Sequence, residues 1–288
     1  MSHFTVLVVG GDVKKMLAPF QENNMGDCPK EYLDFDDEED EYRKQYEEED
    51  IEMVRCPDGS LVYTFDERFR VSGFGIGTGT HHIPEECGYE RVQVKYTDKY
   101  KTFEEFMADF CGYKERDPEK GRYGHWENPN AKWDWYEVGG RWTGFFKLKD
   151  GAQGATGRPG ILTNPARPGW ADQAHKKDID FDAMIEDAAK RAMDAWEKAL
   201  QDKDECSRFF HFGIKKGETK EQHVENARKN ACTTFAVLKD GIWYERGEMG
   251  WFGCVGNEKE DCSWKDEFMK LFDAIGDDEL LTVVDCHI

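Results

Sequence analysis

The segment 133–142 is the part of the sequence whose residue types could best carry chemistry. Aromatic rings can stack on a planar or apolar ligand, and a guanidinium can pair with a carboxylate or phosphate. The same residue types also suit the packing of a core, and the pattern leaves both uses open. The residues of this candidate binding patch, with one tryptophan from a later segment, are Trp133, Asp134, Trp135, Tyr136, Gly139, Gly140, Arg141, Trp142 and Trp251.

The spacing within this segment predicts a β-hairpin. Two runs rich in strand-forming residues, 133–138 and 142–147, flank the Gly139–Gly140 pair. Alternation along the first run would place Trp133 and Trp135 on one face, with Asp134 and Tyr136 on the other.

Arg141 would lie at the mouth of this hairpin. A structural role predicts an internal partner such as Asp134 or Glu137, whereas a functional role predicts an exposed guanidinium near the aromatic rings. The structural role is favoured.

Histidines and cysteines give weaker signals for a metal. His81, His82 and Cys87 lie close together in the sequence, and Cys286 with His287 could meet His3 if the two ends of the chain share a sheet. None of these has the Cys-x-x-Cys spacing that is typical of zinc sites. We therefore predict no metal and no other cofactor.

No specific catalytic motif is present, so a binding role is favoured over an enzymatic one. The glycine-rich run 73–79 is followed neither by Lys-Ser/Thr nor by a helix start. A phosphate-binding loop needs that helix N-terminus. We therefore expect a flexible loop there.

Charge limits the classes of partner. The 288 residues include 60 acidic and 39 basic ones, for a net charge of −21. Such a surface repels nucleic-acid phosphates, so direct nucleic-acid binding is not expected. A partner with a basic surface is expected instead. The apolar run at 5–9 is too short to span a membrane or to act as a signal sequence. Nine irregularly spaced cysteines are typical of reduced thiols, and together these features predict a cytoplasmic protein.

Hydrophobic patterning predicts the α+β class. Apolar runs at 5–9, 233–238 and 280–286 predict strands of one antiparallel or mixed sheet built from both chain termini, with a ferredoxin-like core as one arrangement that fits. Helices are expected at 13–20 and 264–275, packed on one face of that sheet.

We expect one domain, residues 1–288. Its core would come from residues 1–20, 90–150 and 232–288. An acidic insertion would fill 21–90, and a loop-plus-helix insertion 150–230. The sequence leaves the oligomeric state open.

Further helices are expected within and between these parts. Thr102 should cap a helix at 103–110, and Asp180 or Asp182 should begin one that ends near Leu200. A shorter helix is expected at 221–231. The acidic segment 27–52 could form a charged amphipathic helix, because Tyr42 and Tyr46 lie four residues apart, or a solvated loop.

Four segments resemble a family of uncharacterised proteins from tailed bacteriophages and prophages. They are MSHFTVLVVG at the start, LAPF at 17–20, WDWY with GGRW at 133–142, and LTVVDCH near the end. The resemblance implies an accessory protein that acts in the cytoplasm of a bacterial host. It brings no established activity and no catalytic residues.

Three functions follow as expectations. The first is a protein that binds and inhibits a bacterial host protein, such as a defence protein with a basic surface, through an acidic and aromatic patch. The second is a protein that binds or hydrolyses a nucleotide or nucleotide signal, with the Trp/Arg segment as its site and the loop of Arg158 and Arg167 as a lid. The third is a phage structural or assembly factor.

Overall fold

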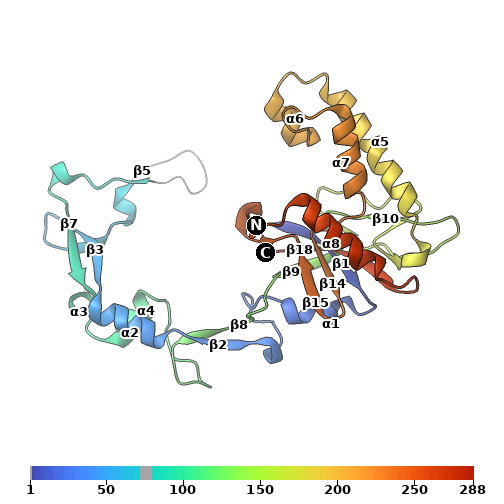
Figure 1. Cartoon of the computed structure of the whole chain (residues 1–288). Helices are drawn as coiled ribbons and strands as arrows, with labels where there is room; N and C mark the ends of the chain where they lie inside the picture. Colours follow the sequence, from blue (N-terminus) through green and yellow to red (C-terminus); the bar gives the residue numbers. More distant parts are fainter. Residues whose placement is uncertain (1, 72–79) are drawn as a thin grey trace. The chain divides into compact units, whose positions relative to one another are not determined.

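The computed structural model describes residues 2–71 and 80–288, which divide into two compact units (Figure 1). The first unit joins Met1–Leu33 to Asn128–Ile288, and the second is Asp34–Glu127. The prediction of a single domain with residues 90–150 in its core therefore differs from the structure. Strand pairing gives the reason, because β7 (Glu90–Lys95) pairs with β3 (Asp50–Arg55) instead of joining the terminal strands. The glycine-rich run 73–79 lies outside the described residues.

A seven-stranded mixed sheet forms the centre of the first unit. Its order is β11-β9-β18-β1-β14-β15, and β13 also pairs with β18. Strand β1 pairs antiparallel with β18 and parallel with β14, so both chain termini share this sheet (Figure 1). The predicted α+β class is confirmed. The strands of the sheet are β1 His3–Val9, β9 Trp135–Gly140, β11 Arg158–Pro159, β13 Gln173–His175, β14 Ala236–Lys239, β15 Ile242–Glu245 and β18 Leu280–His287.

The ferredoxin-like arrangement is not what the sheet shows. That fold is a split β-α-β, in which another strand lies between the two strands joined by the first helix. Here β1 and β14 pair directly and in parallel, through the partners Val6–Ala236, Leu7–Val237 and Val8–Leu238. The return strand β15 lies outside β14.

The two faces of this sheet bury different side chains of the same strand. Val6 and Val8 of β1 pack in one cluster with Leu17 of α1 (Val13–Leu17). Leu7 packs in the other cluster with Phe268 of α8 (Asp261–Asp273). Successive strand residues point to opposite faces, so the two helices cover opposite faces. The prediction that they share one face is wrong.

The segment between β9 and β14 adds helices and short strands to the first unit. Helix α5 (Phe181–Ala199) begins where predicted, because the Asp180 carboxylate accepts a hydrogen bond from the Ala183 N–H. Helix α7 (Lys220–Asn230) also lies where predicted, and Thr219 forms its capping box. The same segment contains β10 Phe146–Lys147, β12 Trp170–Ala171 and α6 Glu205–Phe212. After β15, the first unit adds the paired short strands β16 Glu248–Met249 and β17 Val255–Gly256.

The second unit has its own aromatic core. Helix α2 (Glu39–Glu48) packs Tyr42 and Tyr46 against the buried rings of α4 (Phe103–Asp109), which Thr102 caps as predicted. The acidic segment is therefore a helix over Glu39–Glu48, which confirms that alternative. The other elements are β2 Asp34–Asp37, β4 Leu61–Tyr63, β5 Arg70–Val71, β6 Thr80–His81, α3 Tyr96–Lys99 and β8 Gly124–Glu127, with β3 and β7 as given above.

Among the helices of the described residues, none combines the length and the apolar character that crossing a lipid bilayer requires.

Candidate functional site

The central sheet is polar at one end. Strands β1, β18 and β9 are neighbours, and their register places His3 beside His287 and His287 beside Trp135. Two residues along the strands, Asp285 lies beside Glu137. Because alternate residues share a face, these side chains lie on the same face as Leu7 and Val283, beyond the apolar core.

A histidine–carboxylate pair forms at this end. The His3 Nδ1 atom lies 2.8 Å from Oδ1 of Asp285, a side chain that is only 2% exposed. The second carboxylate oxygen of Asp285 accepts a hydrogen bond of 2.9 Å from the backbone N–H of Arg141. One buried carboxylate thus holds both an imidazole ring and the turn that carries Arg141.

A second pair lies beside the first. The His287 Nδ1 atom is 2.7 Å from Oδ1 of Asp134, and His287 is buried. The Trp135 ring stacks on His287 with centroids 5.1 Å apart, and the His3 ring meets His287 edge-on at 4.9 Å. The three rings therefore pack against one another in a single cluster.

The predicted hairpin is wrong. Strand β9 ends at Gly140, where a turn closes through the hydrogen bond from the Trp142 N–H to the Gly139 carbonyl. The following chain does not return along β9. Instead β10 pairs with β12, and the free edge of β9 pairs in parallel with β11, where Arg158 lies opposite Gly139.

Carboxylates distant in the sequence explain this path. Asp172 is fully buried and accepts hydrogen bonds from the Thr143 hydroxyl (2.9 Å) and from the backbone N–H groups of Gly144 (2.5 Å), Phe145 (3.4 Å) and Gly157 (2.8 Å). Backbone donors buried without such an acceptor would cost free energy. Asp172 therefore holds the segment after β9 against the loop that carries β11.

Both glycines of the turn are needed for space as well as for conformation. Gly139 and Gly140 have positive φ angles of 79° and 52°. A Cβ atom at Gly139 would lie 2.6 Å from the Asp172 carboxylate, and one at Gly140 would lie 2.4 Å from the Asp285 side chain. The glycine pair thus allows two buried carboxylates to approach the backbone.

A cavity of about 720 Å³ opens at this polar end. Protein pockets that bind small molecules have volumes of roughly 300–1,000 Å³. The residues that line it are His3, Trp135, Glu137, Arg141, Arg158, Pro159, Gly160, Ile161, Leu162, Thr163 and Asp285.

Two guanidinium groups in this cavity have no partner among the residues that the structure describes. Across residues 2–71 and 80–288, Arg141 and Arg158 make no side-chain ion pair or hydrogen bond, and both are exposed. The other arginines of this part of the chain bond to a carboxylate or a carbonyl, as Arg167 does to Asp187. The internal partner that we predicted for Arg141 is absent from the described residues, and the geometry matches the functional alternative.

The other residues of the predicted patch take different positions. Trp133 is buried, and its indole N–H donates to the Leu17 carbonyl at 3.0 Å. Tyr136 packs edge-on against Trp133, so Trp133 lies on the opposite face from Trp135. The predicted shared face is wrong because β9 begins only at Trp135. Trp142 packs against the core, and the side chain of Trp251 lies outside what the structure describes.

Among the described residues, the weak metal candidates form no group of three ligand atoms, although His3 and His287 lie side by side. His81, His82 and Cys87 are exposed, and no group of ligand atoms includes them. Cys286 and His287 are consecutive in β18, so their side chains point to opposite faces of the sheet. Burial also raises the pKa of the Cys286 thiol well above its usual value, which disfavours the thiolate that binds metals.

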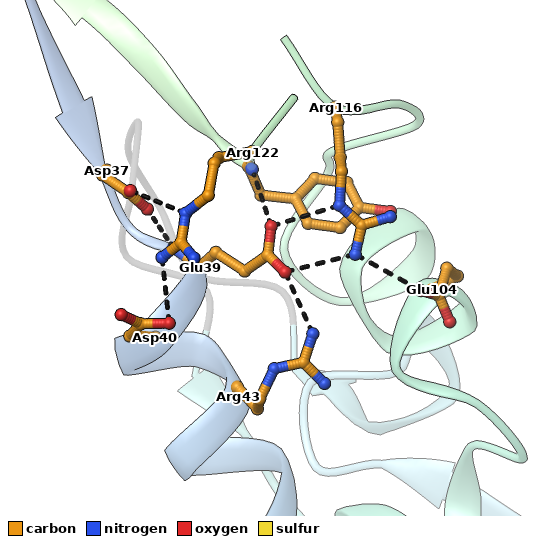
Figure 2. Close-up of polar contacts among 8 residues, drawn as sticks. Asp37, Glu39, Asp40, Arg43, Glu104, Arg116 and Arg122 are labelled. Carbon is orange, nitrogen blue, oxygen red and sulfur yellow. Dashed lines mark hydrogen bonds and ion pairs between the residues drawn. The ribbon is translucent and has the colours of Figure 1, made fainter. Parts of the chain in front are cut away.

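A polar cluster in the second unit is structural in character (Figure 2). The buried Glu39 carboxylate bonds to Arg43 at 3.0 Å, to Arg116 at 3.1 Å and to the Tyr123 N–H at 3.2 Å. The hydrogen bonds from Arg116 lower the pKa of Glu39 from 4.5 to about 2, against the opposing effect of burial. All the charges of this group are paired within the unit, so it offers no site for a ligand.

Comparison of the chain with models of protein families, with curated proteins and with solved structures found no match. The resemblance to phage proteins therefore stays a prediction that rests on the four sequence segments. The function has to be argued from the site itself.

Of the site residues, sequence reasoning found Trp135 and Arg141 and missed the pair formed by His3 and Asp285. From the sequence, His3 is expected only as a partner of Cys286 or His287. An apolar strand that ends in a histidine, opposite another that carries an aspartate, is the signal that could have found this pair.

Proposed function

We propose that this protein binds a nucleotide, or a similar phosphate-bearing ligand with a planar ring, in the cavity at the polar end of the central sheet. The observation that carries the proposal is that Arg141 and Arg158 line the same cavity and form no ion pair with any residue in 2–71 and 80–288. The chain has a net charge of −21, so carboxylates to pair with them are abundant. Guanidinium groups that form no ion pair in such an acidic protein suit an external anion.

The carboxylates of the cavity do not neutralise these arginines. Glu137 lines the cavity without an ion pair to either guanidinium among the described residues, and Asp285 is already bonded to His3 and to the backbone of Arg141. An incoming phosphate can therefore accept hydrogen bonds from both arginines. Each charge-assisted hydrogen bond contributes about 1.5–3 kcal/mol.

Apolar and aromatic groups line the rest of the cavity. Trp135 is 46% exposed, and Ile161 and Leu162, on the loop that also carries Arg158, are 102% and 99% exposed. Stacking of a nucleobase on an aromatic ring contributes roughly 1–3 kcal/mol. A base against Trp135 with its phosphates toward the arginines would use both kinds of surface.

Titration calorimetry and thermal shift with ATP, GTP, cyclic di-AMP, cyclic di-GMP and inorganic phosphate test this proposal. We expect at least one nucleotide to raise the melting temperature, and Arg141→Gln and Arg158→Gln each to weaken its binding about 10- to 100-fold. The matched control is Arg191→Gln, because Arg191 is paired with Asp187 outside the cavity. Binding of none of these compounds, or equal losses in all three variants, would refute the proposal.

A second proposal follows from the exposed Ile161 and Leu162. Two fully exposed apolar side chains at one loop position suit insertion into a pocket of a protein partner. The partner would be a bacterial host protein with a basic surface, bound in the host cytoplasm, as the resemblance to phage proteins and the acidic charge lead us to expect. Replacing both residues with serine should abolish co-purification of that partner, and added salt should weaken it. If the partner co-purifies equally well with the serine variant and at high salt, this second proposal is wrong.

A further inference from the structure

We infer that the cavity also hydrolyses its ligand, a nucleotide with a phosphoanhydride bond, and that His3 is the general base. This inference rests on the proposed nucleotide binding. Its starting point is the hydrogen bond of 2.8 Å between His3 Nδ1 and the Asp285 carboxylate. A carboxylate only accepts, so Nδ1 carries a proton, and in the neutral imidazole Nε2 then has a free lone pair. His3 lines the same cavity as the two unpaired arginines.

The surroundings hold the imidazole in one orientation. Asp285 is buried and is itself fixed by the backbone N–H of Arg141 at 2.9 Å. The ring packs edge-on against His287 at 4.9 Å and against Trp135 at 5.3 Å. An oriented histidine backed by a buried carboxylate is the arrangement that general-base catalysis requires.

The step that this geometry supports is direct attack by water. The Nε2 atom of His3 takes one proton from a water molecule, and the water oxygen forms a bond to the terminal phosphorus. The bridging P–O bond breaks, and its electron pair leaves with the remaining nucleotide phosphate. His3 then returns the proton to the departing phosphate or to solvent. Arg141 and Arg158 would stabilise the charge on the phosphoryl oxygens.

The choice of a phosphoanhydride follows from the titratable groups of the cavity. His3 is the one imidazole among the described residues that line it, and it is used as the base. Asp285 is bonded to that base, and the remaining carboxyl group of the described lining is that of Glu137, a residue type that is ordinarily ionised at neutral pH. No second imidazole among these residues is left to protonate a leaving group. A phosphate leaves without prior protonation, whereas the alkoxide of a sugar ester is a poor leaving group without an acid.

Phosphate release from ATP and GTP, measured with and without Mg²⁺, tests the inference in the full chain. We expect wild type to release phosphate, and His3→Ala to lose at least about 100-fold in kcat while it still binds the nucleotide. Added imidazole should restore part of the rate to His3→Ala, since the truncated side chain leaves room for it. His3→Asn serves where the alanine variant does not fold, and His175→Asn, at an exposed histidine outside the cavity, is the control.

The outcomes separate the two proposals. Nucleotide binding without phosphate release in wild type would overturn the hydrolytic inference and leave the binding proposal intact. Release that persists in His3→Ala and His3→Asn would overturn the role of His3. Absence of nucleotide binding would refute the proposed function, and the inference with it.

Discussion

Replacing Glu39 with glutamine should destabilise the second unit and make its stability less dependent on pH. In the folded chain the Glu39 carboxylate accepts hydrogen bonds from Arg43, Arg116 and the Tyr123 N–H (Figure 2). Glutamine keeps one acceptor oxygen and loses the charge. Two guanidinium groups then lose their shared carboxylate, although Arg116 retains Glu104.

The size of the effect follows from the pKa of Glu39. A fall of the pKa from 4.5 to about 2 corresponds to about 3.4 kcal/mol of folding free energy. The side chains of Arg43 and Arg116 are 41% and 34% exposed, so solvent screens part of this interaction. We therefore expect a loss of about 2 kcal/mol for Glu39→Gln at neutral pH.

The sign of the pH dependence is fixed by the direction of the shift. Because the folded pKa of Glu39 lies below the unfolded value, its contribution is fully present above pH 4.5 and is lost as the pH falls from 4.5 to about 2. The difference in unfolding free energy between wild type and Glu39→Gln should accordingly shrink across that range.

Hydrogen exchange, followed by mass spectrometry in increasing urea, measures the unfolding free energy of the second unit alone. The peptides to follow are those of α2 and α4, at pH 7 and near pH 3. Glu90→Gln is the matched control, because the pair of Glu90 with Arg55 is exposed on both sides, and it should cost less than about 1 kcal/mol. Equal effects of the two variants, or a Glu39→Gln difference that stays constant down to pH 3, would refute the reasoning.

Three further predictions concern the first unit. Gly140→Ala should lower stability by about 2–4 kcal/mol, because φ is +52° and the new Cβ would lie 2.4 Å from Asp285; a melting temperature within error of wild type would contradict this. Asp172→Asn should cost about 2–3 kcal/mol in urea unfolding, since an amide group has one acceptor oxygen for the donors that Asp172 binds, whereas intact stability would show that those bonds are dispensable. Val283→Asp should prevent folding by burying a charge in the core, and soluble protein with an unchanged melting temperature would disprove it.

The terminal strands could be predicted because their signal is local. The apolar runs at 5–9 and 280–284 have no polar residue other than threonine, as strands buried on both faces require. The structure places them side by side as β1 and β18. The faces to which their helices pack could not be predicted, because that choice depends on the loops that connect α1 and α8 to the sheet.

The path after β9 depends on residues distant in the sequence. A Gly-Gly pair between two aromatic runs favours a hairpin on local grounds. Asp172 and Asp285 instead bind the backbone of this turn and direct the chain away from β9. The sequence around a single aspartate in an apolar segment does not show which backbone N–H groups its carboxylate will bind. The division into two units could not be predicted either, because it depends on the pairing of β3 with β7, which are also distant in the sequence.

In the candidate site too, some residues could be predicted from the local sequence, whereas others depend on contacts between distant parts of the chain. Trp135 and Arg141 stand out by residue type, and Arg158 was expected on a loop over the site. His3 and Asp285 are 282 residues apart, and only the antiparallel register of β1 and β18 brings them together. Reading that register from the sequence would require the pairing to be known first.

Gly140 connects the stability of this site to its chemistry. Without a side chain at Gly140, the Asp285 carboxylate reaches the backbone N–H of Arg141 while its other oxygen holds His3. The backbone of Arg141 is therefore held at the cavity without an ion pair of its guanidinium. An arginine that is anchored by an ion pair of its side chain has its charge neutralised. Arg167 is an example, because its guanidinium pairs with the Asp187 carboxylate. Anchoring through the backbone leaves the charge available, and this property makes the cavity fit for an anion in a protein that is otherwise strongly acidic.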